Sequence, residues 1–211
     1  MKIKFIHFLG IASLFLCILT VAIAITINFV PLYAFDLDYF SIPEKLGLSK
    51  TVLLENYHTL LDYLNKPWIT ELHMPDFPSS KDGLFHFYEV KKLFLFNYAV
   101  AAVTTIGSVF YVCFIKRQRL GWKLIRPFQW GMLIPFVVLI LIALNFDQLF
   151  ITFHEVFFNN DAWMFNPSTD PVILALPESF FMHCFILAFV LIELTIIAGY
   201  FFTKHTAFKK E

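Results

Sequence analysis

Two histidines beside long apolar segments carry the side-chain types that acid–base chemistry needs, and His86 is the first of them. His86 begins the run HFYEVK (86–91), and Glu89 follows three residues later. On a helix this spacing places both side chains on one face. A carboxylate there can accept from one imidazole nitrogen and leave the other free as a base. An interfacial histidine with its polar tip in water shows the same local pattern, so the run alone does not decide.

His154 is the second, within the run FHEVFFNND (153–161). If this stretch is helical, Phe150, Phe157 and Phe158 lie at i−4, i+3 and i+4 and flank the ring with aromatic side chains. Burial among them would favour the neutral imidazole, which is a usable base near neutral pH. A histidine packed at a membrane interface for structural reasons remains an equally simple interpretation.

The composition of the chain predicts an integral membrane protein. Of its 211 residues 59% are hydrophobic, 28 are Phe, and the mean hydropathy is +0.71, which is too apolar for a soluble domain. The net charge is zero and the charged share only 15%, which argues against a nucleic-acid partner. Because a spanning backbone must satisfy its own hydrogen bonds, each charge-poor stretch of about 20 residues predicts a helix. We expect spans at about 7–31, 93–115, 127–147 and 179–203.

Lysines and arginines predict the orientation of these spans. They gather in residues 1–4, 116–126 and 204–210, which the positive-inside rule places in the cytoplasm together with both termini. The outer segments are then 36–92 and 147–178. Ala22-Ile23-Ala24 resembles a signal-peptide cleavage site, but the apolar run continues past it, so we expect an uncleaved helix. The sequence therefore predicts an all-α membrane protein, a single membrane domain (1–211) with four transmembrane helices and a small extracellular cap.

The outer segments are expected to mix helix and irregular chain. Residues 49–67 show helical periodicity, with Ser49 or Thr51 available to cap the start and Pro67 to end it. The proline-rich stretch 66–83 and most of 147–178 read as loop. His86 precedes the second expected span by about two turns and His154 follows the third by a similar distance, so the two can converge under the cap.

Several catalytic motifs are missing from the sequence. The run HEVFF departs from the zinc motif HExxH at its fifth residue, Phe158, and no GxSxG elbow or phosphate-binding glycine loop occurs. We expect no metal site. All three cysteines fall inside expected spans and are interpreted as apolar filler: Cys17, Cys113 and Cys184. Glu193 is the one charge inside a span, and its role stays open.

Four local patterns together resemble the bacterial lipoprotein intramolecular transacylases. They are NYHTLLDYLNKP (56–67), HFYEVK (86–91), FHEVFFNNDAWMF (153–165) and LALPESFF (174–181). The similarity covers nearly the whole chain, with four spans and two outer segments of unequal size. Glu89 stands where the family run H-x-x-D-V-K has aspartate, which keeps the charge and adds one methylene.

The resemblance implies a definite reaction in a bacterial cell membrane. The substrate would be a diacylated lipoprotein in the outer leaflet, surrounded by membrane lipid, whose N-terminal cysteine carries a diacylglyceryl group and a free α-amine. The enzyme would move the sn-2 acyl chain onto that amine, giving the lyso form, and would need no cofactor. The two catalytic histidines of the family would match His86 and His154. We assign His86, oriented by Glu89, as base and His154 as oxyanion donor or general acid, although the roles could be exchanged.

Aromatic side chains would confine the substrate and orient its reacting groups. Those that we expect to bind it are Tyr57, Phe85, Phe157, Phe158 and Trp163. One alternative is a non-enzymatic membrane scaffold or sensor whose cap binds a ligand or partner, in which case either histidine would be replaceable. A second is another lipid-modifying or proteolytic enzyme, which would be expected to need a metal.

Overall fold

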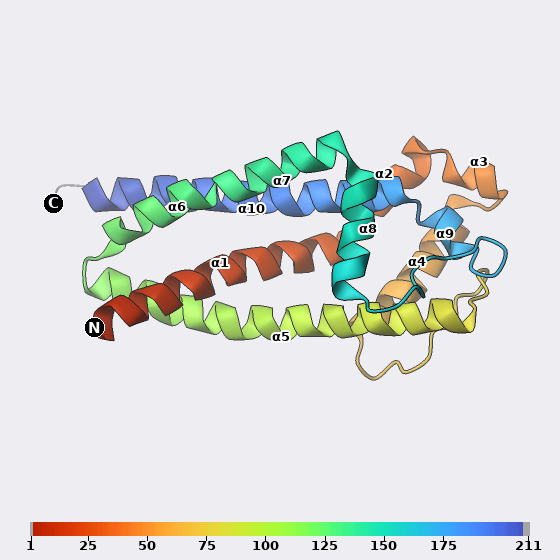
Figure 1. The fold of residues 1–211 in the computed structure, drawn as a ribbon, viewed down its shortest axis with the longest axis horizontal. Coiled ribbons are helices and arrows are strands. Elements are labelled where there is room, and N and C mark those ends of the chain that lie inside the picture. Colours follow the sequence, from red (N-terminus) through yellow and green to blue (C-terminus); the bar gives the residue numbers. More distant parts are fainter. Residues whose placement is uncertain (1, 209–211) are drawn as a thin grey trace. The chain divides into compact units, whose positions relative to one another are not determined.

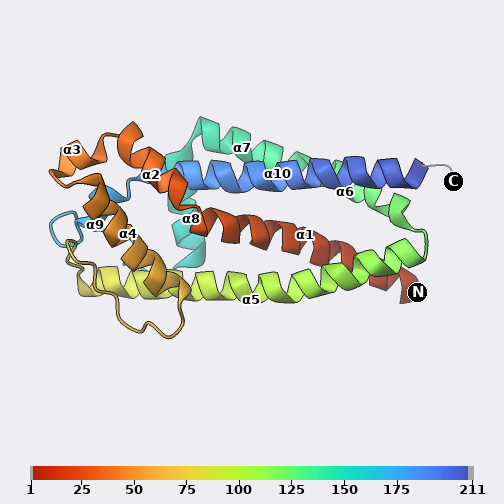
Figure 2. The same ribbon diagram turned by 180° about the vertical axis from the view of Figure 1, so that it is seen from behind.

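The structure is a computed structural model that describes residues 2–208, with the side chains of residues 4–206. Lys209 and Lys210, part of the positive charge used above, lie outside the described residues. No β-strand occurs in residues 2–208, and Figures 1 and 2 show helices joined by turns and loops. The predicted all-α fold is confirmed, and four helical stretches are long and apolar enough to cross a membrane: Lys4–Asn28, Lys81–Arg117, Gly121–Leu144 and Glu178–Thr206.

The chain divides into two compact units. The membrane unit contains the chain up to Thr26, Asn97–Leu144 and the chain from Ile186 onward, and the cap unit contains Ile27–Phe96 and Asn145–Phe185. Three long helices contribute to both units: α1 (Lys2–Asn28), α5 (Lys81–Arg117) and α10 (Glu178–Phe208). Each unit has its own apolar core and is described separately.

The membrane unit packs α1, α5 and α10 with the short helices of the third span. Its core includes Tyr111 and Ile115 of α5, Phe128, and Ile192 and Ile196 of α10. Helices lie side by side in both views of this unit (Figures 1 and 2).

Close packing of α1 against α5 depends on a small residue and on hydroxyl groups. The Cβ of any side chain at Gly10 would overlap the Tyr111 ring, so only glycine permits this approach. Nearby, the Ser13 hydroxyl donates to the backbone oxygen of Thr104 across 3.0 Å. Small and hydroxyl-bearing residues are typical of helix contacts within a bilayer.

The third span is segmented. A 3₁₀ turn (Gly121–Leu124) leads into α6 (Ile125–Gly131), and α7 (Leu133–Leu144) follows after a break at Met132. Asn145 then begins α8 (Phe146–Phe157) by accepting a hydrogen bond from the backbone N–H of Gln148 at 3.3 Å. The hydropathy predicted one helix over 127–147, because the break at Met132 involves no charged residue and does not change the hydropathy.

The cap unit is built from short helices around the beginnings of α5 and α10. They are α2 (Val30–Tyr39), α3 (Ile42–Leu46), α4 (Lys50–Asn65), α8 and α9 (Val172–Ala175). The predicted helix at 49–67 is confirmed as α4, with the Ser49 hydroxyl accepting from the Val52 N–H at 3.3 Å. Helices α2 and α3 were not predicted, because both are short, although the proline in the first turn of each is typical of a helix start.

The stretch between α4 and α5 has no helix, as expected, and polar side chains hold it in place. Buried Asn56 of α4 donates to a carboxylate oxygen of Asp76 at 2.7 Å and accepts from the Asp76 N–H at 3.0 Å. The buried ammonium of Lys91 on α5 donates to the backbone oxygens of Lys66 and Ile69. The irregular chain is therefore fixed against α4 and α5, beside the turn that carries His86.

Candidate active site

Within the cap unit the two histidines meet. His86 lies in the second turn of α5 and His154 in the last turn of α8. Their ring centroids are 5.8 Å apart, and the residues are 7% and 8% exposed. The structure thus brings together two imidazoles that are 68 positions apart in the sequence (154 minus 86) and buries both.

The hydrogen bonding of the two rings differs. His154 Nδ1 lies 2.7 Å from the backbone oxygen of Phe150. A carbonyl oxygen can only accept, so Nδ1 carries the proton and the neutral ring presents an unprotonated Nε2. His86 Nδ1 is buried and makes no hydrogen bond with any described residue. His154 therefore has an assigned tautomer, whereas His86 has a buried nitrogen without a hydrogen bond. Such an unpaired buried atom costs free energy and is uncommon outside functional sites.

Aromatic rings surround the pair. Phe158 contacts both, with its centroid 4.7 Å from that of His86 and 5.6 Å from that of His154. Trp163 stacks on His154 at 4.6 Å, and Phe165 meets His86 edge-on at 5.5 Å. These contacts exclude water from the rings and hold them at fixed angles.

This burial also controls the charge of the pair. It lowers the pKa of His154 below the usual value, and the hydrogen bond to Phe150 offsets only part of the effect. With ring centroids 5.8 Å apart, a proton on one imidazole disfavours a second proton on the other. At neutral pH the histidine pair can therefore accept one proton but does not carry two.

Glu89 does not bond to His86 in the structure. Both of its carboxylate oxygens accept from the side-chain amide of Asn160, at 3.1 Å each. Asn160 also accepts from the Ala162 N–H at 2.9 Å, which shapes the turn leading to Trp163. Glu89 thus joins the helix of His86 to the loop that follows the helix of His154, a different role from the orienting contact expected at i, i+3.

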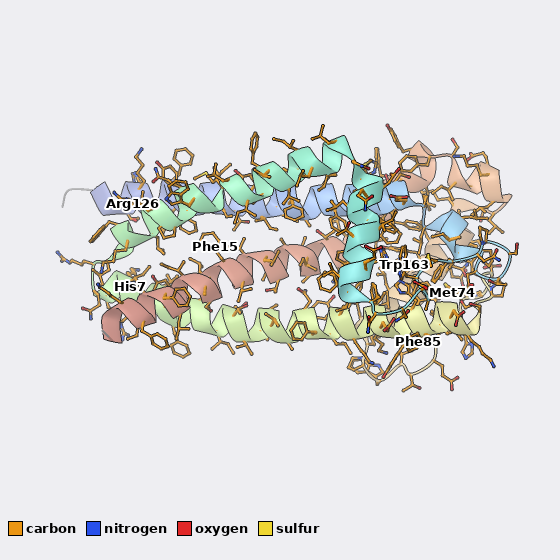
Figure 3. The ribbon with its side chains drawn as sticks, viewed as in Figure 1. His7, Phe15, Met74, Phe85, Arg126 and Trp163 are labelled. Atoms are coloured by element: carbon orange, nitrogen blue, oxygen red, sulfur yellow. The ribbon has the colours of Figure 1, made fainter. Side chains whose placement is uncertain are left out.

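The five aromatic residues expected to bind substrate occupy different positions. Phe158 and Trp163 contact the histidines directly. Phe85 and Phe157 are 47% and 53% exposed, and Phe157 packs on Phe153, which in turn contacts His154. Tyr57 stacks on Tyr33 at 4.0 Å and meets Phe180 at 6.0 Å, in the core of the cap unit. Figure 3 labels Phe85 and Trp163 within this unit.

Sequence reasoning missed two residues of the site, Asn160 and Phe165. Both lie in the loop after α8, where no helical period links them to the histidines. The one usable signal was the pair Asn159-Asn160 directly after an apolar helix, a composition typical of a turn that folds back on itself.

No group of three or more His, Cys, Asp or Glu side chains that could hold a metal ion occurs in the described residues. Two other histidines of the cap, His73 and His183, bond to carboxylates away from the buried pair. His73 pairs with Glu71 on the surface at 3.1 Å, and His183 bonds Asp36 at 2.7 Å.

The helices that can cross a membrane make this a multi-pass integral membrane protein, and its cap unit contains a buried histidine pair. The chain matches the family described as lipoprotein intramolecular transacylase Lit over residues 8–181, which is most of its length. It belongs to that family and is therefore an acyltransferase that acts on lipoproteins, so the scaffold alternative is set aside.

Solved structures agree with this assignment. The in meso structure of the membrane integral lipoprotein intramolecular transacylase Lit from Bacillus cereus superposes with a TM-score of 0.91 at 28% sequence identity, covering 96% of this chain and 94% of that one. Two variants of the Bacillus cereus enzyme, in which a histidine is replaced by arginine or by alanine, each give a TM-score of 0.83 at 28% identity and cover 96% of this chain and 90% and 92% of theirs. A comparison with curated proteins finds no match.

Proposed function

We propose that this enzyme moves the sn-2 acyl chain of a lipoprotein's diacylglyceryl-cysteine onto the α-amine of the same cysteine, with His86 and His154 as the catalytic pair. The observation that carries the proposal is the burial of both imidazoles with their centroids 5.8 Å apart. Donor ester and acceptor amine belong to one molecule, so the chemistry requires proton transfer and orientation but no cofactor.

The tautomer of His154 supports its assignment as the base. The α-amine of a peptide has a pKa of about 7.7–8.0 and is mostly protonated at neutral pH. The unprotonated Nε2 of His154 is the lone pair available to take its proton, because Nδ1 is committed to Phe150. This exchanges the roles expected from the sequence, where His86 was the base.

His86 then serves the other half of the reaction. Attack of the amine on the ester carbonyl forms the C–N bond and an oxyanion, which an N–H donor stabilises. Collapse breaks the ester C–O bond, and the leaving glyceryl oxygen takes the proton that the amine lost. We assign His86 as the N–H donor that stabilises the negative charge on these oxygens. His154 returns the proton to the leaving glyceryl oxygen. The product is an N-acyl lipoprotein with a monoacyl glyceryl group.

The aromatic residues supply orientation in this proposal. Phe158 and Trp163 fix the imidazoles, while half-exposed Phe85 and Phe157 offer apolar surface to acyl chains. Folding a flexible substrate into a cyclic transition state is a large part of such a barrier. Tyr57 contributes through the core of the cap, since its ring packs on Tyr33 and Phe180.

We further propose that the cap unit is extracellular, both termini are cytoplasmic, and the substrate arrives from the outer leaflet. The support is the lysine- and arginine-rich loop 116–126, which the positive-inside rule assigns to the cytoplasm.

Mass spectrometry of the N-terminal peptide of one lipoprotein tests the proposal. The cells would make diacylated lipoproteins and express the wild-type chain, His86→Ala, His154→Ala or the control His73→Ala, which alters an exposed histidine of the same unit. We expect an amide-linked acyl chain and a monoacyl glyceryl group with the wild type and the control. Each catalytic variant should lose on the order of 10²- to 10⁴-fold in rate. Unchanged diacylglyceryl-cysteine with folded wild-type protein in the membrane would refute the reaction.

A further inference from the structure

One end of the membrane unit carries many positive charges and no described negative charge. Figure 1 shows the beginning of α1, the end of α5 and the end of α10 at this same end of the unit. The cations whose side chains are described there are Lys4, Lys116, Arg117, Arg119, Lys123, Arg126 and Lys204. Within the described part of this unit the one carboxylate is Glu193, in the interior of α10. Among the described residues this end therefore offers no carboxylate to balance these cations.

A hollow at this end is lined by one face of the third span. Its volume is about 350 Å³, and its walls are Arg126, Gln129, Trp130 and Leu133. These positions are i, i+3, i+4 and i+7, so across the junction of α6 and α7 they form one stripe. Figure 3 shows Arg126 on α6, at the same end of the membrane unit as His7.

The four side chains change in polarity along the stripe. Arg126 is exposed and makes no hydrogen bond or ion pair with any described residue, so its guanidinium fork is open to an oxyanion. Gln129 is exposed and has an amide, held near the Tyr200 hydroxyl at 3.5 Å. Trp130 is 71% exposed, and Leu133 is 50% exposed further into the span.

That order follows the order of groups in a membrane lipid. A charged phosphate would meet Arg126, the polar glycerol and ester region would meet Gln129 and the Trp130 indole, and the acyl chain would run over Leu133. Tryptophan is the residue that prefers this interfacial depth. We propose that the stripe Arg126–Gln129–Trp130–Leu133 binds one anionic phospholipid at the face of the membrane that bears the loop 116–126.

Two other ligands, free phosphate and a zwitterionic phospholipid, fit the stripe less well. A free phosphate ion would use Arg126 and Gln129 but would leave Trp130 and Leu133 without a role. A zwitterionic phospholipid would add the positive charge of its headgroup to an end of the protein that already has an excess of cations. An anionic headgroup satisfies the guanidinium and also reduces the local repulsion among cations.

Native mass spectrometry of the delipidated protein in detergent can count bound lipids directly. The probes are phosphatidylglycerol, phosphatidylcholine with the same acyl chains, and inorganic phosphate. The variants are Arg126→Gln and Arg117→Gln, since Arg117 is an exposed cation of the same end that lies outside the hollow. Size-exclusion profiles and melting temperatures without lipid establish that both variants are folded.

We expect the wild type and Arg117→Gln to retain one phosphatidylglycerol at low lipid concentration. Arg126→Gln should need about tenfold more lipid, because a charge-assisted hydrogen bond is lost. Equal weakening by both variants would show diffuse attraction and overturn the site. Equal retention of phosphatidylcholine would overturn the anionic preference, and displacement of the lipid by millimolar inorganic phosphate would show that the site is one for free phosphate.

Discussion

His154 donates its Nδ1–H to the backbone oxygen of Phe150, one helical turn earlier, across 2.7 Å. This bond fixes the tautomer of a ring that is 8% exposed and stacked on Trp163. The neighbouring imidazole of His86 has no such bond at Nδ1. The two rings are therefore chemically distinct even though both lie in one aromatic shell.

The acid limb of the pH–rate profile should report His154. Burial lowers the pKa of His154 below 6.5, so the neutral imidazole is present at pH 7. It is lost only as the pH falls through this lowered pKa. Trp163→Ala would let water reach the ring and raise that pKa, so the acid limb should move to higher pH. The measurement is the turnover of a synthetic diacylated lipopeptide from pH 4.5 to 8.

The substrate amine titrates in the same way with both enzymes, so the shift between the two profiles belongs to the protein. Phe85→Ala is the matched control, because this aromatic side chain makes no ring contact with His154 and is already half exposed. Identical acid limbs for the wild type and Trp163→Ala would contradict the assignment of His154 as base.

The contact between Glu89 and Asn160 predicts a positional role for both. Glu89→Gln keeps an oxygen that can accept from the Asn160 amide, so we expect activity within a few fold of the wild type. Asn160→Ala frees the turn before Trp163, and a shift of about 1 Å at reacting groups can cost on the order of a hundredfold. The kcat for the lipopeptide should fall more than KM rises.

Glu89→Ala separates this role from a charge effect on His86. If Glu89 acts only through Asn160, Glu89→Ala should lose no more activity than Asn160→Ala, which also removes the bond to the Ala162 N–H, and the double variant should lose little more than Asn160→Ala alone. A large loss in Glu89→Gln, comparable with that in Glu89→Ala, would show that the negative charge itself is needed and would restore the interpretation drawn from the sequence.

The fold was predictable because a membrane leaves a simple mark on a sequence. Long stretches without charge must be helices, and His86 and His154 could be placed near their ends by counting residues. The breaks within those stretches were missed, although a proline follows each of them. Phe29 interrupts the first one, with Pro31 in the first turn of α2. Met132 interrupts the third, where Pro135 has no N–H to donate to the backbone oxygen of Gly131, and the polarity does not change there.

The partners of the histidines were harder to predict than their positions. The helical period indicated Phe150, Phe157 and Phe158 as neighbours of His154. Phe150 and Phe158 contact it, whereas the Phe157 ring packs on Phe153 instead. It also indicated Glu89 as a partner of His86, but a tertiary contact with Asn160, 71 residues away, takes that carboxylate instead. Spacing defines which side chains share a helical face, whereas the loop that closes over the face depends on the whole fold.

Lys91 should hold the irregular chain between α4 and α5. Its ammonium donates to the backbone oxygens of Lys66 and Ile69 and lies 4.4 Å from the centre of the Tyr63 ring. Lys91→Met would leave two carbonyl groups without this donor, at a cost of about 2 kcal/mol in local stability. We expect faster amide hydrogen exchange at residues 66–72.

The adjacent Lys92→Met is the control, because the Lys92 side chain is exposed and lies over the Tyr88 ring. It removes the same charge and should leave exchange in 66–72 unchanged. Equal protection in Lys91→Met and the wild type would mean that packing alone holds this segment.

The buried pair of Asp36 and His183 should give the cap a stability that depends on pH. Asp36 is 0% exposed, one oxygen lies 2.7 Å from His183 Nδ1, and the other has no partner among the described residues. Burial raises the pKa of Asp36, with the hydrogen bond from His183 opposing it. The folded protein therefore binds this proton more tightly than the unfolded chain does, and the contribution to stability declines as the pH rises through the raised pKa.

Asp36→Asn keeps an acceptor for His183 without the buried charge, so its melting temperature should gain on that of the wild type as the pH rises from 4 to 8. Asp36→Ala leaves His183 Nδ1 without an acceptor and should lose about 1–3 kcal/mol. Asp38→Asn, which removes a neighbouring exposed charge paired with Lys50 at 2.6 Å, should change the melting temperature little at any pH. A constant difference between Asp36→Asn and the wild type across this range would show that Asp36 stays ionised in the folded protein despite its burial.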